Sequence, residues 1–86
     1  MSKKFIILHL EDKFNDFVQG KISPLEFGSY LESSVNALEA IDYDIVDAAR
    51  DFSNRLEGYV FFPEETLENI IADIQTWLTS IKQDKN

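Results

Sequence analysis

Apolar residues recur at helical spacing in four stretches of this chain, and short polar or glycine-containing connections separate them. A side chain that returns to the same face every third or fourth residue is typical of a helix with one buried stripe. The stretches predict helices at about residues 4–19, 23–40, 43–57 and 63–82. There is no hairpin signal, internal repeat or linker. The pattern therefore predicts one all-α domain over residues 1–86, an antiparallel four-helix bundle.

The four stripes also name the side chains expected in the core. They are Ile7, Leu10, Phe14, Phe17 and Val18 in the first stretch, and Leu25, Phe27, Tyr30, Leu31, Val35 and Leu38 in the second. The third contributes Ile45, Ala48, Ala49, Phe52 and Leu56, and the fourth Leu67, Ile70, Ile71, Ile74, Trp77, Leu78 and Ile81. Full burial of such side chains is worth about 1.5–3 kcal/mol each, enough for one modest core.

Two helix ends carry local signals. Gly20 follows the first stretch and is a natural C-terminal stop, because glycine readily adopts the left-handed conformation. Ser23 and Glu26 flank Pro24 as a capping box, in which each side chain accepts the other residue's amide. Residues 5–8 read Phe-Ile-Ile-Leu, so the first turn of the first helix could instead be a short strand.

The third stretch separates into two faces on a helical wheel. Asp44, Asp47 and Asp51, here called the acidic stripe, lie roughly opposite its apolar residues. The stripe should therefore face solvent. Glu39 and Asp42 add two more acids just before it.

The connection to the fourth helix is unusually aromatic. Gly58 is expected to end the third helix and Pro63 to open the fourth, which leaves Tyr59 to Phe62 between them. At least two of the three rings should pack over the end of the bundle. A ring left exposed, Tyr59 or Phe61, would anchor a partner. The fourth helix would carry three acids in its first turns, Glu64, Glu65 and Glu68.

The charge of the chain is strongly negative, with 16 acids against 8 bases and a formal charge of −8. Between Ile22 and Ile81 the only bases are Arg50 and Arg55. Such a surface repels nucleic acid and acidic membranes and attracts basic proteins. Carboxylates one turn apart also repeat about every 5 Å along a helix, so the acidic stripe could mimic phosphates in a basic groove. The alternative is that the acids only keep a small domain soluble.

Catalysis is poorly supported by the sequence, although a pair of carboxylates could do acid–base work if the bundle had a cleft. The chain has no cysteine, no Gly-x-Ser-x-Gly motif and no glycine-rich phosphate loop, and its single histidine, His9, sits beside an apolar stripe. Asp42, Asp44 and Asp47 start like a calcium loop, but Val46 and Asp47 stand where it needs an acid and a glycine. We therefore expect no enzyme activity, metal or cofactor. Since no apolar run approaches the about 20 residues of a membrane span, a cytoplasmic protein is expected.

Three segments resemble the colicin D-type immunity proteins. Residues 14–27, Phe-Asn-Asp-Phe-Val-Gln-Gly-Lys-Ile-Ser-Pro-Leu-Glu-Phe, are similar to the end of that family's first helix and the Glu-Phe start of its second. Residues 48–52 are similar to its Ala-Ala-x-x-Phe, and residues 62–67 to an acid-rich start of its last helix. The chain departs from the family pattern between Leu31 and Ala48.

This resemblance implies a protein that protects its own cell from a secreted antibacterial toxin. Members of the family bind a basic, tRNA-cleaving nuclease domain, from a colicin or a contact-dependent growth inhibition effector, and cover its active site. The implied state is a monomer that forms a 1:1 heterodimer with the toxin. Asp47, Asp51, Glu64 and Glu65 lie in or near the matching segments.

The full set of expected partner-binding residues is Asp42, Asp44, Asp47, Asp51, Tyr59, Phe61, Glu64, Glu65 and Glu68. Asp42 and Asp44 belong to it on charge alone. Two alternatives are an acidic adaptor with no inhibitory role and a structural dimer formed through the fourth helix.

Overall fold

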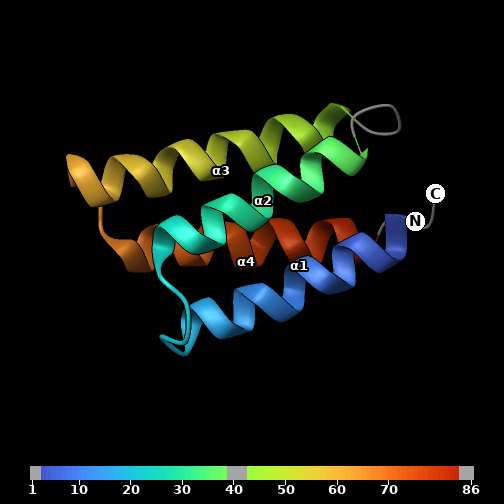
Figure 1. The fold of residues 1–86 in the computed structure, drawn as a ribbon, viewed down its shortest axis with the longest axis horizontal. Helices are drawn as coiled ribbons and strands as arrows, with labels where there is room; N and C mark the ends of the chain where they lie inside the picture. Colours follow the sequence, from blue (N-terminus) through green and yellow to red (C-terminus); the bar gives the residue numbers. More distant parts are fainter. Residues whose placement is uncertain (1–2, 39–42, 84–86) are drawn as a thin grey trace.

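A computed structural model describes residues 3–38 and 43–83, and the side chains of residues 3, 35–38 and 43 are not among the described atoms. These described residues form four helices, α1 (Lys3–Val18), α2 (Pro24–Leu38), α3 (Tyr43–Phe61) and α4 (Leu67–Gln83). Successive helices run antiparallel, and α4 returns beside α1 (Figure 1). The predicted all-α four-helix bundle is confirmed. The first turn of α1 is helical, which excludes the alternative of a strand at residues 5–8.

The core lies between the four apolar stripes. Its aromatic centre is formed by Phe14, Phe17 and Phe27, with the rings of Phe17 and Phe27 stacked 5.1 Å apart. Phe52 of α3 and Trp77 of α4 make a second ring contact, with centroids 5.3 Å apart. These contacts join α1 to α2 and α3 to α4, so each antiparallel pair is held by aromatic packing.

Two of the described residues in the predicted stripes are exposed. Val18 is 51% exposed because it is the last residue of α1, where the chain turns away from its neighbours. Leu25 is 41% exposed because it lies in the first turn of α2, at the open side of that helix. Tyr30 is half-buried, and its ring makes a T-shaped contact with the His9 ring of α1, with centroids 6.0 Å apart. The side chains of Val35 and Leu38 lie outside the described atoms.

The local signals at the ends of α1 and α2 act as predicted. Gly20 has a φ of 79°, its N–H donates to the carbonyl of Phe17, and the N–H of Lys21 donates to that of Asp16. This pair of bonds is a Schellman motif. At α2 the amide of Glu26 donates to Ser23 Oγ (3.1 Å), and the amide of Ser23 donates to Glu26 Oε1 (3.2 Å).

The prediction for the α3–α4 connection was wrong at both ends. Gly58 stays helical, with no positive φ, and α3 continues to Phe61. The helix α3 ends at Phe61 because Phe62 precedes Pro63, and a residue before a proline disfavours helical geometry. Pro63 therefore terminates α3 and does not open α4. The helix α4 begins only at Leu67, after Thr66, whose Oγ1 accepts the amide of Asn69 (3.2 Å) as an N-cap.

Candidate partner-binding surface

The acidic stripe of α3 faces solvent. Asp44, Asp47 and Asp51 are all exposed, whereas Ile45, Ala49, Phe52 and Leu56 on the other face are buried. No hydrogen bond or ion pair joins the three carboxylates to another residue in the described ranges. Asp42 lies outside the described residues. The charge of the stripe is therefore available to a partner and takes no part in the packing of the bundle.

The predicted acids of the fourth helix are placed differently from expectation. Glu64 and Glu65 precede α4, and only Glu68 lies in its first turn. Asp51 is ten residues before the end of α3, about 15 Å along the helix axis. The structure therefore separates the acidic stripe, at the middle and start of α3, from the group at the α3–α4 connection (Figure 1).

Glu65 is held within the molecule by an ion pair. Arg55 of α3 donates from Nε to Glu65 Oε1 (2.9 Å) and from Nη2 to Glu65 Oε2 (3.0 Å). The same Nη2 donates to Asp73 of α4 (2.8 Å), and Asn69 donates to Glu65 (2.9 Å). The hydrogen bond from Arg55, and to a lesser extent that from Asn69, lowers the pKa of Glu65. The hydrogen bond between Arg55 and Glu65 in turn raises the pKa of Arg55. The Arg55 contacts thus fasten the connection to α3 and α4, and Glu65 is not a free acid.

The aromatic rings of the connection also depart from expectation. Only Tyr59 packs against the core, whereas Phe61 and Phe62 are 62% and 77% exposed. Phe61 is exposed because the extra turn of α3 places it at the last residue of the helix, beyond the core. Of the two predicted anchors, Phe61 is accessible and Tyr59 is half-buried.

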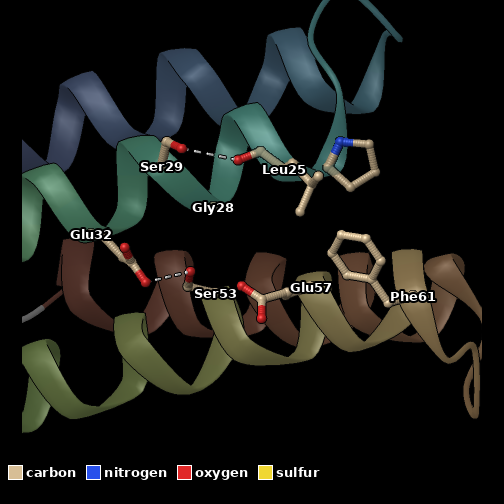
Figure 2. A pocket seen from close by; sticks show the side chains of 8 residues that line it. Leu25, Gly28, Ser29, Glu32, Ser53, Glu57 and Phe61 are labelled. Carbon is tan, nitrogen blue, oxygen red and sulfur yellow. Dashed lines mark hydrogen bonds between the residues drawn. The ribbon is translucent and has the colours of Figure 1, made fainter.

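A groove between α2 and α3 lies next to Phe61, and the sequence reasoning did not find it. It has a volume of about 290 Å³ and is lined by Pro24, Leu25, Gly28, Ser29, Glu32, Ser53, Glu57 and Phe61. Figure 2 shows Phe61 facing Leu25 across the groove and Glu57 reaching into the space between the helices. Gly28 was the only signal in the sequence, since a glycine inside a helix permits a close neighbour.

Comparison of the chain with protein families, curated proteins and solved structures found no match.

The surface has the chemistry of a binding site for cations and apolar groups. Within residues 3–38 and 43–83, no group of three or more histidine, aspartate or glutamate side chains could hold a metal ion. In the same part of the chain, no helix is both long and apolar enough to cross a membrane. The exposed carboxylates and the exposed ring of Phe61 are groups that contact basic and amphipathic surfaces of proteins.

Proposed function

We propose that this protein binds a basic protein partner through the outward face of α3 and acts as an immunity protein against a nuclease toxin. The observation that carries the proposal is the acidic stripe. Asp44, Asp47 and Asp51 are exposed, have no partner among the described residues and repel one another along one helix. Folding does not require three like charges on this face, so their presence favours a role in binding.

The inhibitory action follows from charge and spacing. Carboxylates on successive turns of α3 repeat about every 5 Å, close to the phosphate spacing of a nucleic-acid strand. They occupy the lysine- and arginine-lined site where the toxin would hold its tRNA, so substrate and inhibitor exclude each other. The net charge of −8 speeds the encounter with a basic domain. The protein needs no cofactor or catalytic residue for this action.

The resemblance of residues 14–27, 48–52 and 62–67 to colicin D-type immunity proteins narrows the proposal to a tRNA-cleaving toxin. The partner would be a basic nuclease domain from a colicin or a contact-dependent inhibition effector. It would be bound 1:1 by a monomer in the cytoplasm of the producing cell. Glu64 and Glu68 form a second contact region, since both side chains are exposed.

The test begins with co-purification of this protein with the product of the adjacent upstream gene, followed by a tRNA-cleavage assay. The variant Asp47→Lys/Asp51→Lys should weaken binding by at least 100-fold, about 2.7 kcal/mol, and slow association. The matched control is Asp12→Lys/Asp16→Lys, which reverses an equally spaced pair on α1 and should leave binding within a few-fold.

Two outcomes would contradict the proposal. If the variant Asp47→Lys/Asp51→Lys inhibited the toxin as well as the wild type, the acidic stripe would not be part of the binding surface. A basic partner that binds through the stripe while tRNA cleavage continues would instead support the acidic adaptor.

A further inference from the structure

The groove between α2 and α3 is a built site with polar and apolar parts. Its floor is the contact between Gly28 and Ser53, and the buried hydroxyl of Ser53 donates to Glu32 Oε1 at 3.0 Å. Glu57 lies one helical turn beyond Ser53 on α3 and also lines the groove. Two carboxylates from two different helices therefore face one small space (Figure 2).

Neither carboxylate is neutralised from within the described chain. Ser53 uses its single proton on Glu32, which leaves the other carboxylate oxygen of Glu32 without a partner among the described residues. Glu57 has no hydrogen bond or ion pair to any described residue. Among residues 3–38 and 43–83, no lysine, arginine or histidine lines the groove. The electrostatic complement of this space is therefore a positively charged group.

The other end of the groove is apolar. Pro24, Leu25 and Phe61 form its walls, and the last two keep 41% and 62% of their surface exposed. An exposed leucine and an exposed aromatic ring beside two carboxylates match a side chain with an apolar stem and a cationic head. The volume of about 290 Å³ lies at the lower limit for drug-sized ligands, about 300–1,000 Å³, and suits one side chain.

We propose that this groove binds one arginine side chain of a basic protein partner. The guanidinium lies between Glu32 and Glu57, and its stem packs on Leu25 and Phe61. Arginine fits better than lysine, because its planar fork offers five donors to acceptors on two helices and its flat face stacks on an aromatic ring. The inference rests on the proposed function in that it needs a basic protein partner, and it adds a contact surface that the acidic stripe does not include.

The test is a nuclear magnetic resonance titration of the full ¹⁵N-labelled chain with the peptide acetyl-Gly-Arg-Gly-amide. Saturable shifts are expected at the amides of Gly28, Ser53 and Glu57, with a dissociation constant of roughly 1–10 mM, as for one solvent-facing ion pair with some apolar contact. The same peptide with citrulline in place of arginine is nearly isosteric but neutral, so it should shift these amides at least about 10-fold less. Equal shifts with both peptides would overturn the proposal.

Variants separate the groove from the general negative field. Glu32→Gln/Glu57→Gln keeps the acceptor for Ser53 and should weaken arginine binding by about 10-fold, and Phe61→Ser by about 3-fold. Asp12→Asn/Asp16→Asn removes the same charge from α1 and should change it less than 2-fold. An equal loss in the two double variants would show non-specific attraction and overturn the site.

The titration contains no toxin, so its result is independent of the tRNA-cleavage assay. Arginine binding without toxin inhibition would support the arginine site in the groove and contradict the proposed immunity function. Toxin inhibition without arginine binding would contradict only the proposed arginine site.

Discussion

Gly28 of α2 lies so close to Ser53 of α3 that a methyl group on Gly28 would stand 3.3 Å from Ser53 Oγ. That hydroxyl is itself fixed, because it donates to Glu32 on α2. The contact lies where the two helices with the most extensive interface in the bundle approach each other, and it forms the floor of the groove. Backbone proximity and the polar lining of the groove therefore have a common origin.

Gly28→Ala is expected to leave the free energy of unfolding within about 0.5 kcal/mol of the wild type. Alanine gains about 1 kcal/mol of helix propensity over glycine. The new methyl group offsets this gain, because it displaces a hydroxyl that is held by Glu32. In a Ser53→Ala background the obstruction is gone, so Gly28→Ala should stabilise by the full ~1 kcal/mol. Urea unfolding of the four proteins measures this coupling.

Gly58→Ala is the matched control for Gly28→Ala. Gly58 also lies inside a helix, but a methyl group there meets nothing within 4 Å. The substitution should stabilise by about 1 kcal/mol in the wild-type background. If Gly28→Ala gave the same gain without Ser53→Ala, the contact with Ser53 would impose no constraint.

The ion pair of Glu65 with Arg55 should make stability depend on pH in the acidic range. The pKa of Glu65 in the folded protein lies below its ordinary value of 4.5, chiefly because Arg55 donates to it. Above pH 4.5 the carboxylate is charged in both states and the stabilisation is complete. Below pH 4.5 the unfolded chain protonates Glu65 first, while the folded protein still keeps it charged. When the pH falls through the lower pKa of the folded protein, Glu65 is protonated in both states and the stabilisation is lost.

Glu65→Gln should therefore lower the urea midpoint most above pH 4.5, and the difference from wild type should shrink as the pH falls below the folded pKa. Glu64→Gln is the control, since this neighbouring acid is exposed and bonds to no described residue. A Glu65→Gln difference that stays constant with pH would assign the effect to packing.

The acidic stripe should cost stability at its centre and not at its start. Asp47→Asn removes repulsion from Asp44 and Asp51, so it should stabilise by a few tenths of a kcal/mol at low salt and by less at high salt. Asp44→Asn should give no gain, because Asp44 lies in the first turn and interacts favourably with the helix dipole. Thermal unfolding at two salt concentrations compares them. A destabilising Asp47→Asn would mean that the stripe serves the fold.

The sequence by itself determined the features that depend on neighbours along the chain. The capping box at Ser23, the Gly20 stop and the buried and exposed faces of α3 all follow from contacts within one or two helical turns. The periodicity of apolar residues likewise fixed four helices and their inward faces, because helical geometry alone decides which residues share a face. The outward position of Asp44, Asp47 and Asp51 belongs to this class.

Only the tertiary structure decided the features that join residues distant in sequence. Glu65 was one acid among several until Arg55, ten residues before it, came within 3 Å. Glu32 and Glu57 became one site because Gly28 lets α2 approach α3 at Ser53. The physical reason is that helix propensity and capping act over a few residues, whereas grooves and ion pairs between helices need a packing geometry that no local pattern encodes.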